Sequence, residues 1–398
     1  MIETLLRGLP YYFVFIFLFG IYRKYNMVIL YQGQFVAAGN CTRQILYDHK
    51  RKRLLNYAYL ILLLFFGFRG YVYTDFVNYK PVFDMLDGFN NLSEIFLLKG
   101  WEPGFLVYTA LCKAIIPDYF AWNVISTIID LFLLYKVLER YSNNHLLSLM
   151  VFFVIGSAAL EFNVLRNAKA IFLFLYSLRY IEGRKMWKYF AVIGIACLFH
   201  ISSILYFPFY FFLHKRWPQW ILWCVCVGGL LILCLHIGFV SDIVSRMSFS
   251  EGSRIEHLAS HLDNSVAYTS SFGNIERMFT MLIICMLYNK LAGNCIGNYM
   301  FINLYVCLYA VFTISSESVV MVQRFQYMFI ASFWVLYPLL IKYAKIHRNE
   351  TIYLFTVTMI FMKLILIGAD PNLKYDNILT GFDDFDTKVN YVEKNLGK

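Results

Sequence analysis

The segment at residues 161–200 reads EFNVLRNAKAIFLFLYSLRYIEGRKMWKYFAVIGIACLFH, and it constrains the membrane topology of the whole chain. Arg166 and Lys169 lie between two apolar runs. An ionisable side chain at membrane depth costs about 2.5–3.5 kcal/mol, so it usually faces a wet cavity or a partner. If 163–170 is helical, Asn163, Arg166 and Lys169 share one face that could hold a multivalent anion. Alternatively, both cations reach out to lipid headgroups.

The composition is that of a membrane protein. Of 398 residues, 60% are hydrophobic and 15% are charged, whereas a soluble domain carries about 25% charged residues. Apolar runs recur along the whole chain, which predicts several membrane spans. The net charge of +10 is concentrated in short loops beside apolar runs, a pattern typical of cytoplasmic loops and not of nucleic-acid binding. The nine cysteines are scattered, without the spacing of a metal or disulfide framework.

Loop charges orient the spans. After a first span at 9–31, the loop that ends at Arg53 is the most basic in the chain, which places this loop in the cytoplasm and the N-terminus outside. A second span at 54–68 leads to an outer segment at 70–118, which contains a short embedded helix at 104–117. By the same rule, five later cations are placed in the cytoplasm: Lys136, Arg140, Arg184, Lys185 and Lys188.

The remaining spans complete the fold prediction. We expect them at 119–137, 145–161, 167–181, 219–239, 275–291, 299–315, 326–342 and 350–368. Residues 188–213 form either one crossing or two short helices that meet at His200, and the bent pair keeps both basic ends in the cytoplasm. The sequence therefore predicts an all-α polytopic transmembrane helix bundle of about 10–12 membrane helices. It forms one domain over 1–368, with a large outer loop at 240–273 and a short polar tail at 369–398.

Charged residues from distant segments meet at the outer face in this topology. They are the cations Arg69, Arg166, Lys169 and Arg324, the carboxylates Asp75 and Glu102, and His200. Arginine matches phosphate oxygens in pairs, and a carboxylate or histidine can accept a proton from a sugar hydroxyl. The set therefore predicts a site for an anionic, lipid-linked substrate. Each residue also has a purely structural interpretation, such as an ion pair between Arg69 and Asp75 or a core position for His200.

Four motifs follow one another in a recognisable order. They are Arg69 with Asp75 and Tyr79, then Glu102-Pro103-Gly104-Phe105, then Arg166 at the start of a span, then Phe199-His200-x-Ser202-Ser203 with Pro208 beyond. In this order they resemble the EpsG/Wzy-type family of bacterial polysaccharide polymerases, over roughly residues 60–330. Asn167 stands where the family pattern has Gln, and Thr74 stands where a Gly-Thr pair often precedes the Asp.

The resemblance implies a GT-C-like inner-membrane enzyme that joins lipid-linked oligosaccharide repeat units. The donor is the growing chain on undecaprenyl pyrophosphate, and the acceptor is the terminal sugar of the incoming unit. Asp75 matches the position of the GT-C catalytic acid and is the first candidate for the base, His200 is the second, and Glu102 orients the acceptor hydroxyl. The expected pyrophosphate ligands are Arg69, Arg166, Lys169 and Arg324, and the expected sugar contacts are Tyr79, Asn163 and Asn167.

Two other functions stay open on the sequence. One is a GT-C glycosyltransferase that uses a polyprenyl-phosphate sugar, or an O-antigen ligase. The other is a transporter of lipid-linked oligosaccharide, which predicts charges along a path through the membrane and not at one face. The expected partners are the lipid bilayer, a chain-length regulator and a flippase, and no nucleic acid. No cofactor is expected, with divalent-metal dependence left open. The expected location is the bacterial cytoplasmic membrane, with the site facing outward.

Overall fold

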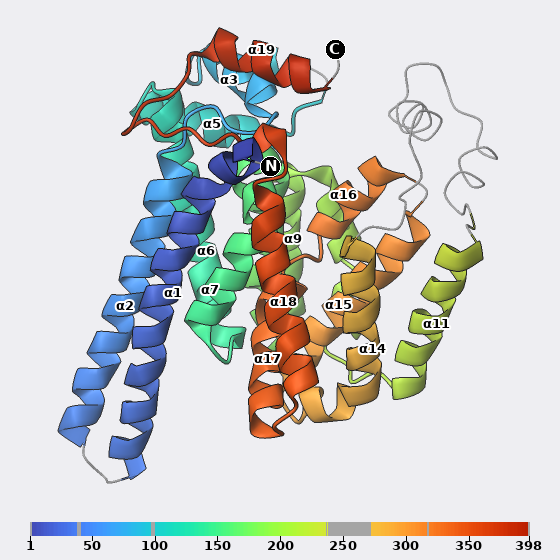
Figure 1. Cartoon of the computed structure of the whole chain (residues 1–398). Coiled ribbons are helices and arrows are strands. Elements are labelled where there is room, and N and C mark those ends of the chain that lie inside the picture. The colour runs from blue at the N-terminus through green and yellow to red at the C-terminus, as the bar shows by residue number, and fades with distance from the viewer. Residues whose placement is uncertain are drawn as a thin grey trace. The chain divides into compact units, whose positions relative to one another are not determined.

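The computed structural model (Figure 1) describes residues 2–37, 41–96, 100–235, 237, 272–316 and 318–396. Within these ranges the chain is helical and forms no β-strand, so the predicted all-α polytopic bundle is confirmed. Four segments are long and apolar enough to cross a membrane: Thr4–Leu30, Tyr119–Tyr141, Ile296–Ile314 and Glu350–Ile367. Shorter apolar helices accompany them at Pro103–Ile115, His145–Val154, Met186–Phe199, Ile201–Phe212 and Gln219–Leu235.

The chain forms two compact units, a division that the sequence does not predict. Unit 1 comprises Met1–Phe207 and Ile360–Lys398, and unit 2 comprises Pro208–Met359. All the candidate site residues except Arg324 belong to unit 1.

Unit 1 contains the first nine helices of the chain. They are α1 (Ile2–Ala37), α2 (Cys41–Gly67), α3 (Phe76–Met85), α4 (Leu92–Ile95), α5 (Pro103–Ile115), α6 (Tyr119–Tyr141), α7 (His145–Val154), α8 (Leu165–Glu182) and α9 (Met186–Phe199). The long helices α1 and α2 lie side by side, and α6 packs against α2 and α8. Asp118 begins α6 because its carboxylate accepts the Ala121 N–H at 2.7 Å, which satisfies one of the free donors of the first turn.

The connection between α7 and α8 corrects one prediction. Residues Ala159–Asn163 form a π-helical turn, which the Val164 N–H closes by donating to the Ala159 carbonyl at 2.9 Å. Val164 then leaves the helical region, with φ −82° and ψ 52°, and α8 begins at Leu165. The expectation that Asn163 shares one helical face with Arg166 and Lys169 is therefore wrong, because the helix that carries the two cations starts after Asn163.

The chain folds back at His200, as the bent version of residues 188–213 predicts. Helix α9 ends there because His200 is extended, with φ −155° and ψ 122°, and a 3-10 helix at Ile201–Tyr206 follows. The Tyr189 hydroxyl donates to the Tyr206 carbonyl at 2.6 Å. Seventeen residues separate these two atoms along the chain, so a straight helix would hold them about 25 Å apart. The hydrogen bond requires the reversal.

The C-terminal segment is part of unit 1. Its backbone pairs with the residues that follow α2: the Gly70 N–H donates to Asp376 at 3.0 Å, and the Ile378 N–H donates to Phe68 at 2.9 Å. A side chain at Gly70 would come within 2.8 Å of Phe382, so the close approach requires glycine here. The last helix, α19 (Phe385–Leu396), packs Phe385, Val389 and Val392 into the aromatic cluster around Tyr71 and Phe76. Figure 1 shows α3, α5 and α19 together at one end of unit 1.

Unit 2 is also helical. It contains α10 (Phe209–Phe212), α11 (Gln219–Leu235), α14 (Phe272–Ala292), α15 (Ile296–Ile314), α16 (Val319–Tyr327), α17 (Ser332–Ile346) and most of α18 (Glu350–Ile367). Arg324 is an exposed residue of α16. The predicted outer loop at 240–273 lies outside the described residues except for its last two positions, which begin α14.

Candidate active site

An ion pair between Arg166 and Glu102 joins the start of α8 to the start of α5. One guanidinium nitrogen, Arg166 Nη1, lies 2.6 Å from Glu102 Oε2 and donates to the Gly100 carbonyl at 2.7 Å. The Glu102 and Arg166 side chains are 12% and 24% exposed, so the pair lies at the boundary of the fold and not in its core. Arg166 Nε is buried and has no hydrogen-bond partner in the described part of the chain. The protein therefore holds the guanidinium through Glu102 and Tyr79 and leaves the Nε donor without an acceptor.

Aromatic side chains fix the position of this arginine. The guanidinium carbon of Arg166 lies 4.4 Å from the centre of the Trp101 ring, within the range of a cation–π contact. The backbone N–H of Arg166 donates to the Tyr79 hydroxyl, with 3.5 Å between nitrogen and oxygen. Burial lowers the pKa of Arg166, but Tyr79 and Glu102 outweigh this effect and raise it. Arg166 therefore stays positively charged at every physiological pH.

Asp75 lies one helical turn before Tyr79 on α3. The backbone links the two residues, since the Tyr79 N–H donates to the Asp75 carbonyl at 3.0 Å. Burial and the nearby Asp75 carboxylate raise the pKa of Tyr79 well above its ordinary value, so the phenol stays neutral. Asn163 orients the turn before α3: its side-chain oxygen accepts from Thr74 Oγ1 at 2.9 Å and from the Asp75 N–H at 3.1 Å. Asp75 and Arg166 thus flank one tyrosine.

Gly104 brings the Glu-Pro-Gly-Phe motif against the end of α9. A Cβ atom at this position would lie 2.6 Å from the Leu198 Cβ and 2.8 Å from its carbonyl oxygen, so only glycine fits. Two residues after Leu198, the His200 ring begins the reversal. Its Nδ1 accepts the Ser202 N–H at 3.3 Å and lies 2.7 Å from the Ser202 hydroxyl. The motif that carries Glu102 and the motif that carries His200 are therefore neighbours.

Two of the predicted phosphate ligands lie in the interior of unit 1. Arg69 is 3% exposed and donates to the Phe66 carbonyl at 2.6 Å and to the Asn123 amide oxygen at 2.9 Å. Lys169 is 4% exposed and forms an ion pair with Asp130 of α6. Both cations thus bind acceptors of the protein itself, and the structure does not bring them to Arg166. Asn167, a predicted sugar contact, is also buried, at 7% exposure.

Two residues that matter here were not predicted from the sequence. Trp101 precedes Glu102 and supplies the ring beneath Arg166. Asp130 is a carboxylate inside an apolar span, which by itself signals a buried cationic partner. Within the described ranges, no three His, Cys, Asp or Glu side chains gather as a metal site would require.

Comparison with known proteins gives one match. The model of the EpsG family matches residues 52–377, which is most of the chain and includes every candidate site residue. No curated protein and no solved structure matches the chain. The matched range contains all the motifs described above, from Arg69 to Arg324, together with most of the apolar helices. The chain is therefore a membrane protein that belongs to the EpsG family, whose members are polysaccharide polymerase-like.

Proposed function

We propose that this protein is a polysaccharide polymerase that joins undecaprenyl-pyrophosphate-linked oligosaccharide repeat units on the outer face of the cytoplasmic membrane. Family membership supports the broad activity. The observation that supports the specific proposal is the unsatisfied Nε of Arg166, which has no acceptor in the described part of the chain while Nη1 is held by Glu102. The Nε and Nη2 edge of a guanidinium matches two oxygens of one phosphate group.

The proposed chemistry is a transfer of the growing chain. The Asp75 carboxylate accepts the proton of the acceptor hydroxyl, and that oxygen attacks the anomeric carbon of the donor sugar. The bond between this carbon and the pyrophosphate oxygen breaks, and its electron pair stays on undecaprenyl pyrophosphate. Arg166 stabilises the negative charge that develops on the leaving group. His200 is the alternative base.

Glu102 has two roles in this proposal. Before substrate binds, its carboxylate holds Arg166 Nη1 over Trp101, so the guanidinium is already oriented. When substrate is present, the same carboxylate accepts a hydrogen bond from the acceptor hydroxyl and orients it. Preorganised charge of this kind costs no rearrangement during the reaction.

The interior cations have a different role in the proposal. Because Arg69 and Lys169 bind internal acceptors, we assign them to holding α2, α6 and α8 together, not to the pyrophosphate. Tyr79 and Asn163 position Asp75 and Arg166 from the protein side. The phosphate contact predicted for Arg324, which belongs to unit 2, stays a prediction from the sequence.

Reconstitution of the full chain with synthetic lipid-linked repeat units tests the proposal. We expect wild-type protein to extend the units into a ladder of polymers and to release undecaprenyl pyrophosphate, whereas Arg166→Gln leaves single units. Lys188→Gln, which removes an exposed cation at the opposite end of unit 1, is the matched control and should polymerise normally. Transfer of one sugar without a ladder would point to a simple glycosyltransferase. Movement of lipid across the bilayer without a new glycosidic bond would point to a transporter.

A further inference from the structure

A second charged feature lies at the other end of unit 1, between α6 and α8. It is a cavity of about 350 Å³ lined by Lys136, Glu139, Arg140, Tyr176 and Arg179, among others. This volume falls within the range of small-molecule sites, about 300–1,000 Å³. Arg179 is 13 residues beyond Arg166 along α8, which is about 20 Å along the helix axis. The cavity is therefore separate from the candidate active site.

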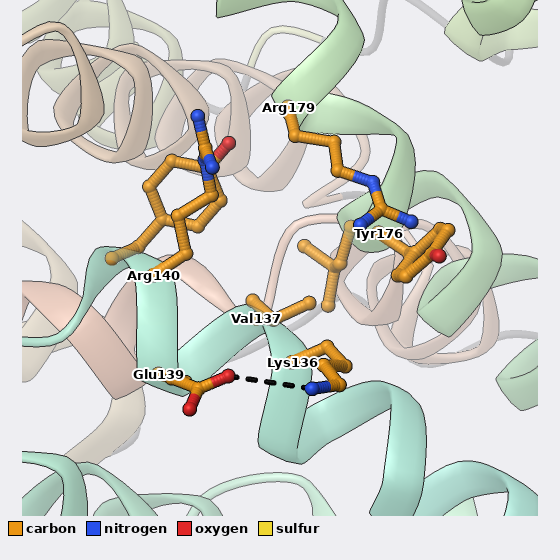
Figure 2. A pocket seen from close by; sticks show the side chains of 8 residues that line it. Lys136, Val137, Glu139, Arg140, Tyr176 and Arg179 are labelled. Atoms are coloured by element: carbon orange, nitrogen blue, oxygen red, sulfur yellow. Dashed lines mark ion pairs between the residues drawn. The ribbon is translucent and has the colours of Figure 1, made fainter.

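The cations around the cavity differ in how they are paired. Arg140 is neutralised by Glu182, at 2.7 Å, and Lys136 lies 3.5 Å from Glu139. Arg179 makes no ion pair within the described part of the chain. Its guanidinium carbon lies 3.4 Å from the centre of the Tyr176 ring, and its Nε is buried without a hydrogen-bond partner. Figure 2 shows Arg179 and Tyr176 on α8, across the cavity from Lys136 and Glu139 on α6.

An exposed apolar stripe runs along α6 into this cavity. Ile128 and Phe132 are 48% and 57% exposed, and Lys136 and Arg140 follow at the same spacing of four residues. Positions four apart lie on one face of a helix. A ligand that matches both features needs an anionic group for the cavity and a hydrocarbon chain for the apolar stripe.

We infer that this cavity binds the headgroup of an anionic phospholipid, with the phosphate on Arg179 and Lys136 and one acyl chain along Ile128 and Phe132. The sequence places this end of α6 and α8 in the cytoplasm, because Arg184, Lys185 and Lys188 follow directly. The lipid would then belong to the inner leaflet. Basic pockets between membrane helices on this side are suited to anionic headgroups. The inference does not depend on the proposed polymerase activity.

Binding of fluorescent phosphatidylglycerol to the purified full-length protein in detergent tests this inference. We expect labelled phosphatidylglycerol to bind and labelled phosphatidylcholine to bind at least tenfold more weakly. Each cation near an anionic lipid contributes about 1 kcal/mol, equivalent to about fivefold in affinity. Arg179→Gln should therefore weaken binding about fivefold to tenfold, and Lys136→Gln about fivefold. Lys188 is an exposed residue near the start of α9 and does not line the cavity. Lys188→Gln should therefore change binding less than twofold.

Competition separates the lipid from phosphate alone. We expect unlabelled phosphatidylglycerol to displace the probe, and glycerol 3-phosphate or inorganic phosphate to fail at the same concentration. Displacement by glycerol 3-phosphate at the concentration of the lipid would overturn the acyl-chain part of the inference. An equal loss of binding in Lys188→Gln and Arg179→Gln would overturn it altogether, since diffuse surface charge then explains the binding. If Arg179→Gln is misfolded, the exposed Lys136→Gln variant decides.

Discussion

Arg166 and Lys169 lie three residues apart on α8, and each forms an ion pair with a carboxylate, but the two pairs differ in burial. The Arg166–Glu102 pair is partly exposed, and Arg166 Nε has no acceptor in the described part of the chain. The side chains of the Lys169–Asp130 pair are only 5% and 1% exposed, and Lys169 also donates to the Ser126 carbonyl at 3.1 Å. Two cations in one sequence motif are therefore held differently: Arg166 lies at the boundary of the fold, and Lys169 joins α6 and α8 in the interior.

Loss of one partner of the buried pair should have the largest effect on stability. Asp130→Asn removes the carboxylate that pairs with Lys169 in the interior, and breaking a buried pair costs about 3–5 kcal/mol. We expect a large loss of folded protein, measured as the thermal unfolding temperature in detergent and as resistance to protease. The double variant Asp130→Leu with Lys169→Met removes both charges and should recover much of the stability. Equal unfolding temperatures for wild type and Asp130→Asn would show that the Asp130–Lys169 pair does not stabilise the fold.

Loss of Arg166 should affect activity and leave stability almost unchanged. Arg166→Gln removes the group that we propose stabilises the leaving pyrophosphate, and loss of one such donor costs about 10²–10³ in rate. Because the pair with Glu102 is partly exposed, the unfolding free energy should change by about 1 kcal/mol or less. The rate of polymer formation and the thermal unfolding temperature, measured on one preparation, check both parts. A variant that unfolds early and keeps its activity when cooled would reverse the roles assigned to the two pairs.

A substitution at Gly104 tests whether the close contact between α5 and α9 holds Glu102 in position. Gly104→Ala places a methyl group 2.6 Å from the Leu198 Cβ, and such overpacking typically costs about 1–3 kcal/mol. We expect a moderate drop in unfolding temperature together with reduced polymer synthesis, because Glu102 lies two residues away and would move with the helix start. Gly194→Ala is the matched control, since nothing lies within 4 Å of a side chain added there. Unchanged activity in Gly104→Ala would show that this contact does not position Glu102.

The pairing of Arg166 with Glu102 was easier to anticipate from the sequence than the buried pair of Asp130 with Lys169. Arg166 and Glu102 stand at span ends, where charge patterns indicate topology directly, and the reversal at His200 follows from the basic residues on both sides of 188–213. The Asp130–Lys169 pair depends on how α6 and α8 are rotated about their axes, which loop charges do not determine. The spacing of apolar and basic residues in each helix leaves several rotations open.

The C-terminal segment shows the same limit. Its acids and lysines predicted a polar tail, yet Phe385, Val389 and Val392 lie four and three residues apart and form one apolar face. That spacing was a readable signal for an amphipathic helix. The partner of this face could not be predicted, because it is the Tyr71 and Phe76 cluster more than 300 residues earlier in the chain.

Glu102→Gln should give the smallest effect and the sharpest contrast with Asp130→Asn. Both substitutions turn a carboxylate into an amide beside a cation of α8. At Glu102, water reaches the pair and Trp101 still lies under the guanidinium, so the unfolding free energy should fall by about 0–1 kcal/mol. Polymer synthesis should fall severalfold, because Arg166 is less firmly oriented. The same calibrated unfolding assay should separate the two variants by at least about 2 kcal/mol. If Glu102→Gln destabilises the protein as much as Asp130→Asn, Arg166 is a structural cation as well. Its unpartnered Nε would then not support binding of a phosphate group.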